Sequence, residues 1–126
     1  MSLRTPLAAA RGLGSAKEGV DHWWKQRLTA IALVPLLLWL GFSVALMGTA
    51  DYYTVVDWLA HPVNAGLMVL VLAVGFWHGV LGLQEVIEDY VATEWKKITL
   101  IIAIQFAAVV LALAGIFAVL RISLGA

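Results

Sequence analysis

The sequence contains no cysteine among its 126 residues and few charges, which make up 13% of the chain. Without cysteine, the chain has no disulfide, thiolate zinc site, cysteine-ligated iron–sulfur cluster or thiol nucleophile. Its net charge is zero and no basic block is present, so the electrostatic footprint of a nucleic-acid-binding protein is missing. No nucleophile–base pair, metal cluster or phosphate-binding loop stands out either, and an autonomous enzyme is therefore not predicted.

Apolar residues dominate instead, at 63% of the chain, and they lie in long runs. Three windows without a formal charge each exceed the roughly 20 residues that cross a hydrocarbon core about 30 Å thick. We therefore expect an all-α membrane protein with three transmembrane helices over about 28–48, 62–87 and 98–120. These helices form one membrane domain, 20–126. Residues 1–19 are small and polar and lack the apolar core of a secretory signal, so they are expected to form a flexible cytoplasmic tail.

Basic residues set the expected orientation. Seven of the eight Lys and Arg residues lie in the N-terminal segment or between the second and third spans, whereas the first connection carries Asp51 and Asp57 and no basic residue. By the positive-inside rule the N-terminus faces the cytoplasm. Trp23, Trp24 and Trp95 then mark the inner interface and Trp58 the outer one. We expect a bacterial inner membrane, with the mitochondrial inner membrane as the alternative, because the N-terminal segment is poorly patterned for import.

The second predicted helix carries a polar stripe. At about 100° per residue its members fall within a sector of roughly 80°. They are Asn64, Val71, Gly75, His78, Gly82, Glu85 and Asp89. Lipid does not satisfy polar groups, so the stripe is expected to face protein, a cofactor or water. A chain with three spans has little room to bury the stripe internally, which favours packing against a partner subunit.

His78 lies in the middle of this stripe and has two interpretations. A neutral imidazole can hydrogen-bond across to another helix, as intramembrane histidines commonly do. It can also be an axial ligand to haem iron, which needs a neutral imidazole nitrogen and a dry, apolar setting. Gly75, Gly79 and Gly82 remove side chains around the imidazole and would let a flat macrocycle approach the helix. Spacing alone leaves both interpretations open.

Two further groups lie near the expected cytoplasmic interface. Asp89 and Tyr90 are about 16 Å along the helix axis from His78. A tyrosine there is either an interfacial anchor or a hydrogen-bond donor to a quinone carbonyl, with the carboxylate handling protons. The lead-in to the first span, "DHWWKQRLTA", reads as an interfacial anchor formed by its two tryptophans, Lys25 and Arg27. We expect Arg27 at about the depth of Asp89 and Tyr90, so that the two helix ends converge on one ligand.

The lead-in "HWWKQRLTA", the three spans with an inside N-terminus, and the spacing of His78 from Asp89 and Tyr90 resemble a known family. It is the small hydrophobic membrane anchor subunit of succinate dehydrogenase, respiratory complex II. The resemblance covers about residues 19–120. It implies a non-catalytic subunit of an enzyme complex in the tricarboxylic acid cycle and in electron transport. A flavoprotein subunit would oxidise succinate, and an iron–sulfur subunit would pass the electrons to ubiquinone in the membrane.

The resemblance also implies roles for individual residues. His78 would supply one axial ligand to the iron of a b-type haem, and a cytochrome b-type anchor subunit would supply the other. Tyr90 would help to bind ubiquinone, with Asp89 and Arg27 as supports and Trp23 nearby. The implied partners are therefore these three subunits and membrane lipid, with no nucleic acid.

One position departs from the family pattern, and two other functions remain open. Some relatives carry a histidine one residue before His22, where this chain has Asp21, so a proton role for His22 is not assigned. A haem-free, quinone-linked anchor of the fumarate reductase type would use the same bundle as a tether, and the glycines around His78 argue against it. A small transporter or channel component would line a water path with the polar stripe, although the first and third spans offer little matching polarity.

Overall fold

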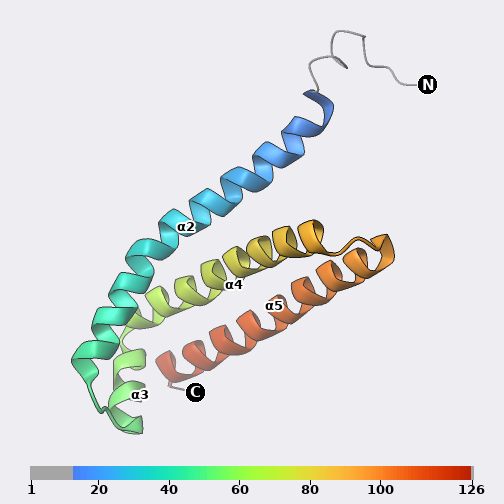
Figure 1. The fold of residues 1–126 in the computed structure, drawn as a ribbon. Coiled ribbons are helices and arrows are strands. Elements are labelled where there is room, and N and C mark those ends of the chain that lie inside the picture. The colour runs from blue at the N-terminus through green and yellow to red at the C-terminus, as the bar shows by residue number, and fades with distance from the viewer. Residues whose placement is uncertain (1–12, 126) are drawn as a thin grey trace.

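The computed structural model describes residues 13–125, and all regular structure in that range is helical (Figure 1). The helices are α2 (Leu13–Met47), α3 (Tyr52–Ala60), α4 (Pro62–Tyr90) and α5 (Glu94–Ser123). The first twelve residues of the predicted tail 1–19 lie outside the described residues, and α2 begins within the remainder of that segment. Its opening turns contain Ala16, Lys17 and Glu18, which are good helix formers.

Three of these helices are long and apolar enough to cross a membrane, which confirms the predicted number of spans. The candidate spans are Gly19–Met47, Pro62–Tyr90 and Glu94–Ser123, of 29, 29 and 30 residues. At about 1.5 Å per residue each helix is roughly 44 Å long, more than the ~30 Å of a hydrocarbon core. The helix ends therefore extend into the interfacial layers, where Trp23, Tyr90 and other amphipathic side chains are found.

The short helix α3 was not predicted. It begins after Asp51, whose side-chain Oδ1 accepts hydrogen bonds from the backbone N–H of Thr54 (2.9 Å) and from the Thr54 hydroxyl (2.7 Å). His61 ends α3 and also caps α4, because its Nδ1 accepts from the backbone N–H of Val63 at 3.2 Å. Pro62 then occupies the first position of α4, where its missing N–H has no cost. The first connection is therefore ordered and compact.

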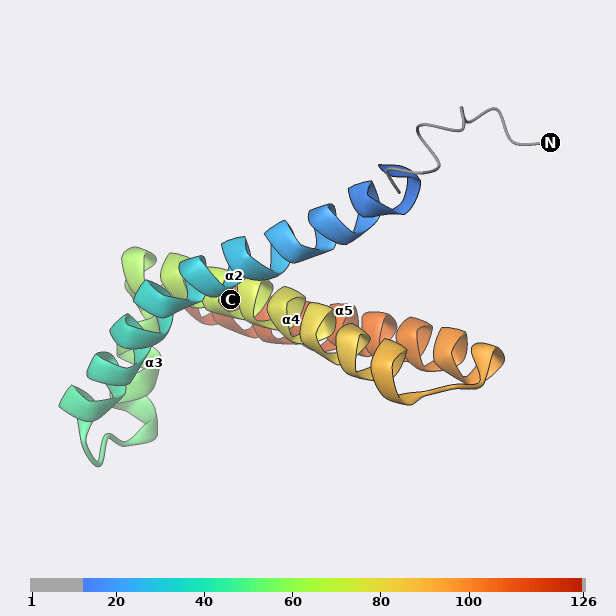
Figure 2. The same ribbon diagram turned by 45° about the horizontal axis from the view of Figure 1, so that its top comes forward.

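The central helix is α4. It forms an antiparallel hairpin with α5, closed by residues 91–93, and α2 runs obliquely along it on the way to α3 (Figure 1). Within the described residues, α2 and α5 do not pack against each other. Pro35 lies inside α2, and the later turns of this helix bend away from the line of its earlier turns, as expected from the missing backbone donor (Figure 2).

Few side chains are buried within the chain. Among the described residues they are Leu33, Ala65, Leu81, Ile87, Val119 and one polar residue, Thr29. Most large apolar side chains of the three spans point outward. Apolar side chains in contact with water carry a free-energy cost, and lipid tails or other membrane subunits cover such a surface without that cost.

Candidate functional site

The polar stripe of α4 packs mainly against α2 of the same chain. Four residue pairs meet in antiparallel order: His22 with Glu85, Gln26 with Gly82, Thr29 with His78, and Leu33 with Gly75. Farther along the stripe, Asn64 donates to the backbone oxygen of Trp58 at 3.0 Å and so joins α4 to α3. α2 therefore covers part of the stripe, and none of its members is fully buried within the described chain, so packing against a partner subunit stays a prediction. Asp89 alone among its charged members lacks a partner in the described chain.

The contact at the centre of this row joins Thr29 and His78. Thr29 Oγ1 lies 2.9 Å from His78 Nδ1, and it also lies 2.8 Å from the backbone oxygen of Lys25 and 3.1 Å from that of Gln26. The His78 ring is half-buried, and Thr29 is 5% exposed. The other ring nitrogen, Nε2, has no hydrogen-bond partner among the described residues and is not fully enclosed. Hydrogen bonding across to another helix, one of the two interpretations of His78, is thus realised at Nδ1.

The three glycines around His78 differ in what faces them. A Cβ on Gly82 would lie 3.6 Å from Gln26 Nε2, and one on Gly75 would lie 4.0 Å from Leu33 Cδ2. Nothing lies within 4 Å of the corresponding point on Gly79. At Gly75 and Gly82 the missing side chains therefore allow the close approach of α2, and not of a flat ligand as expected from the sequence. Only Gly79 stays open on its side of α4.

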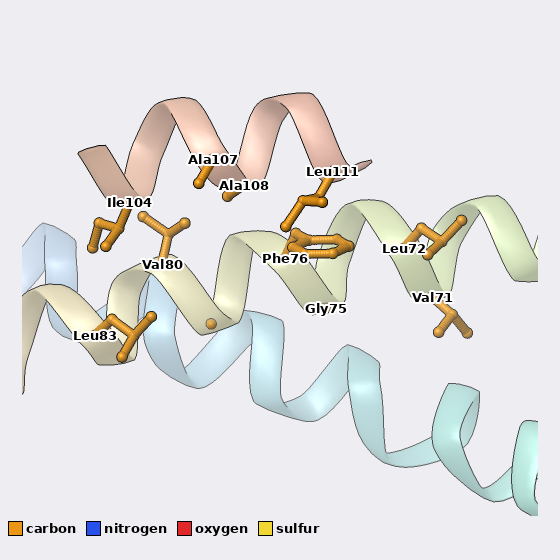
Figure 3. Close-up of a pocket in the computed structure, with 11 residues that line it drawn as sticks. Val71, Leu72, Gly75, Phe76, Val80, Leu83, Ile104, Ala107, Ala108 and Leu111 are labelled. Atoms are coloured by element: carbon orange, nitrogen blue, oxygen red, sulfur yellow. The ribbon is translucent and has the colours of Figure 1, made fainter. Parts of the chain in front are cut away.

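Gly75 and Gly79 also border an apolar groove between α4 and α5 (Figure 3). The groove has a volume of about 550 Å³, and its other walls include Phe76 and Val80 of α4 and Leu111 of α5. Figure 3 shows Phe76 and Val80 pointing from α4 toward α5. No polar side chain lines it, and His78 is not part of its wall. The groove can accommodate an apolar chain or side chains but offers no ligand for a polar group.

At the Tyr90 end of the bundle, His22 and Glu85 form a second polar contact. His22 Nδ1 lies 3.3 Å from Glu85 Oε1, and the two side chains are 25% and 48% exposed. His22 Nε2 and Gln26 Oε1 are enclosed and have no hydrogen-bond partner in the described structure. Sequence reasoning missed this pairing. The signal in the sequence was a shared spacing. Seven residues, or about two helical turns, separate His22 from Thr29, and the same number separates His78 from Glu85.

Arg27 lies deeper in the bundle than expected. His22 pairs with Glu85, so these two residues lie at the same depth. Arg27 lies five residues beyond His22 toward the middle of the bundle, and Asp89 lies four residues beyond Glu85 toward the Tyr90 end. Nine residues at about 1.5 Å each place the two backbones roughly 13 Å apart in depth. The Arg27 guanidinium stacks over the Trp23 ring, 5.1 Å from its centroid. The side chains of Arg27 and Trp23 are therefore in contact, and the backbones of both residues lie deeper in the bundle than the last residue of α4.

Asp89 and Tyr90 are both exposed, and the phenol ring ends α4. Tyr90 is 83% exposed. Neither residue makes a side-chain hydrogen bond or an ion pair within the part of the chain that the structure describes. An unpaired phenol beside an unpaired carboxylate is available to a ligand or to another subunit. No group of three or more His, Asp or Glu side chains in residues 13–125 could hold a metal ion.

Comparisons with known proteins agree over most of the chain. The family of succinate dehydrogenase/fumarate reductase transmembrane subunits matches residues 1–112. The succinate dehydrogenase hydrophobic membrane anchor subunit of Rickettsia bellii is 35% identical over 116 residues, covering 92% of this chain and 93% of that protein. The corresponding protein of Paracoccus denitrificans is 33% identical over 122 residues, covering 97% of this chain and 94% of that protein. No solved structure gives a significant match.

Proposed function

The chain belongs to the family of succinate dehydrogenase/fumarate reductase transmembrane subunits, and we propose that it anchors a succinate dehydrogenase in a bacterial inner membrane. In this role His78 would hold the iron of a b-type haem, and Tyr90 would form one wall of a ubiquinone site. Succinate oxidation to fumarate releases two electrons and two protons. Ubiquinone takes up two electrons and two protons to become ubiquinol, so the overall reaction balances.

The single observation that carries the haem proposal is the state of the His78 ring. Nδ1 is held by Thr29 Oγ1 at 2.9 Å, and Nε2 has no hydrogen-bond partner among the described residues. An imidazole fixed at one nitrogen and unpaired at the other suits haem iron. When bound, the haem would supply one-electron redox chemistry, and a cytochrome b-type partner subunit would help to hold it.

Tyr90 carries the quinone part of the proposal. Its phenol is exposed at the last residue of α4 and can donate a hydrogen bond to a quinone carbonyl. Asp89, exposed beside it, would relay protons from water to the reduced quinone. Arg27 and Trp23, which stack on each other, lie deeper and would border the site from that side.

The partners follow from the surfaces that the chain leaves uncovered. Apolar side chains on the outer faces of α2 and α5 suit lipid and a cytochrome b-type anchor subunit. The iron–sulfur and flavoprotein subunits would lie at the Tyr90 end. That end is cytoplasmic by the positive-inside rule, since Lys96 and Lys97 follow closely on α5.

The test of this function is the spectrum of the complex purified through this chain with His78→Ala. We expect the b-type band in the reduced-minus-oxidised spectrum to disappear. His61→Asn is the matched control, because it removes a histidine from the other end of α4 and retains a residue that can cap the helix. A wild-type spectrum in the His78 variant would contradict haem ligation.

A second function has a specific observation in its favour. The His78 imidazole already has an interhelical hydrogen bond, and α2 covers two of its three flanking glycines. These contacts suit a haem-free anchor, in which His78 only joins two helices. The same experiment separates the two functions, since a haem-free anchor gives a wild-type complex without any b-type band.

A further inference from the structure

We propose that Thr29 is the positioning residue for His78: its hydroxyl accepts the Nδ1–H hydrogen bond and so presents Nε2, with its lone pair, to the haem iron. This inference rests on the proposed haem ligation and adds a residue that sequence reasoning did not single out. Thr29 belongs to α2 and His78 to α4, so the contact links the two helices at mid-span.

The positions of four atoms decide the direction of the hydrogen bond. Thr29 Oγ1 lies 2.8 Å from the Lys25 backbone oxygen. Two oxygens approach this closely only when a hydrogen lies between them, and a carbonyl has none to give. Thr29 Oγ1 also lies 3.1 Å from the Gln26 backbone oxygen, so the single hydroxyl hydrogen of Thr29 is directed to these two carbonyls. The oxygen then meets His78 Nδ1, 2.9 Å away, as an acceptor, so Nδ1 carries a hydrogen.

This direction fixes the protonation pattern of the ring. A neutral imidazole with a hydrogen on Nδ1 has its lone pair on Nε2. Nε2 is the nitrogen that has no partner among the described residues. Metal-binding histidines ordinarily donate their remote N–H to a neighbouring acceptor, which sets both the ring's tautomer and its orientation. The Thr29 oxygen is placed to be that acceptor.

Burial makes the hydroxyl hard to replace. Thr29 is the one polar side chain buried in the described part of the chain, at 5% exposure, and Leu33 is buried one turn further along. No open water surrounds the Thr29 oxygen, so its loss leaves Nδ1–H without an acceptor in an apolar interface. The ring would then lose both its fixed orientation and part of its basicity.

The test uses the full complex with Thr29→Val, which keeps the shape of threonine and removes the hydroxyl. We expect the affinity of the complex for haem to fall about 10- to 100-fold, the usual cost of losing a partner to a metal-binding histidine, and haem content per chain to fall with it. Haem that remains should show a higher midpoint potential and altered electron paramagnetic resonance (EPR) g-values, because a less basic imidazole stabilises the ferric state less. Thr29→Ser should restore all three readouts.

Thr99→Val is the matched control, since the Thr99 hydroxyl bonds only to the Trp95 backbone oxygen, at 2.7 Å, and touches no imidazole. Wild-type haem content, potential and g-values in Thr29→Val would overturn the positioning role while leaving ligation by His78 intact. Haem retained in His78→Ala would instead overturn the proposed ligation itself.

A measurement on the unmodified complex tests the positioning role without a variant that could fail to assemble. Double-resonance spectroscopy of the oxidised haem in H₂O should detect a proton on the remote nitrogen of the imidazole, and this signal should disappear on exchange into D₂O. Its absence in H₂O would overturn the inference without any variant. Should Thr29→Val fail to assemble, a Thr29→Ser complex with low haem content would also overturn it, because serine keeps the hydroxyl.

Discussion

Replacing Gly82 by leucine is expected to push α2 away from α4, whereas the same replacement at Gly79 should leave the two helices in place. The difference follows from what faces each glycine. A Cβ on Gly82 would lie 3.6 Å from Gln26 Nε2, in ordinary contact, and the further carbons of leucine would meet the Gln26 side chain. A Cβ on Gly79 meets nothing within 4 Å.

The size of the effect can be estimated from this geometry. Overpacking a filled interface costs about 1–3 kcal/mol, and a factor of ten in an equilibrium corresponds to about 1.4 kcal/mol. Gly82→Leu should thus shift the equilibrium between packed and separated helices by roughly 5- to 150-fold. Gly82→Ala should be nearly neutral, because its Cβ fits at 3.6 Å. Gly79→Leu should cost the isolated chain little, yet it should displace any haem or partner subunit that fills the open side.

The absence of cysteine makes the measurement direct. Val20→Cys and Val86→Cys add two exposed label sites, one on α2 and one on α4, and both native side chains are 52% exposed. Distances between spin labels in the full chain in micelles should broaden and lengthen for Gly82→Leu alone. In the purified complex, haem or partner content should fall for Gly79→Leu.

Two outcomes would refute this reasoning. An unchanged distance distribution in Gly82→Leu would show that α2 does not pack on this glycine. Wild-type haem and partner content in Gly79→Leu would show that nothing covers the open side of α4 in the complex.

Three other predictions concern different parts of the chain. Tyr90→Phe should lower quinone reduction about tenfold, the effect of one hydrogen bond of ~1.4 kcal/mol. Succinate oxidation with a soluble artificial electron acceptor should stay unchanged, and an equal loss of both activities would reject the quinone role. The hydroxyl and backbone N–H of Thr54 hold the pKa of Asp51 below its usual value. The cap on α3 should therefore persist above that usual value and loosen as the pH falls through the lowered pKa, which a carboxyl NMR titration can follow against Asp51→Asn. Trp39 and Trp58 stack with centroids 5.3 Å apart, and a double-mutant cycle should find a coupling of about 1 kcal/mol.

The spans were predictable because they depend on local composition. A charge-free run longer than about 20 residues has few alternatives to crossing the bilayer. The short helix α3 was missed, since its nine residues lie between turn-forming residues and read as a loop. Its signal was Asp51 three residues before Thr54, the spacing of a side chain that caps a helix.

The register between α2 and α4 was not predictable in the same way. The charge-free window does not show where its helix begins, and α2 begins well before the window, at Leu13. We expected Arg27 at about the depth of Asp89, whereas the observed pairing places it roughly 13 Å deeper. The position of Thr29 opposite His78 was not predictable for the same reason, because it depends on how far the two helices are shifted along each other. This shift is set by packing at Gly75 and Gly82 and not by composition.

The contact between Thr29 and His78 has more effect on orientation than on stability. An interhelical hydrogen bond in a membrane contributes on average only about 0.6 kcal/mol, and at most about 1.7. The close approach of α2 at Gly75 and Gly82 provides dispersion contacts along the whole interface, so the helices remain packed without the hydroxyl. The ring, by contrast, has no second hydrogen bond among the described residues to hold it. Loss of the Thr29 hydroxyl should therefore change the properties of a bound haem while the distance between α2 and α4 stays the same.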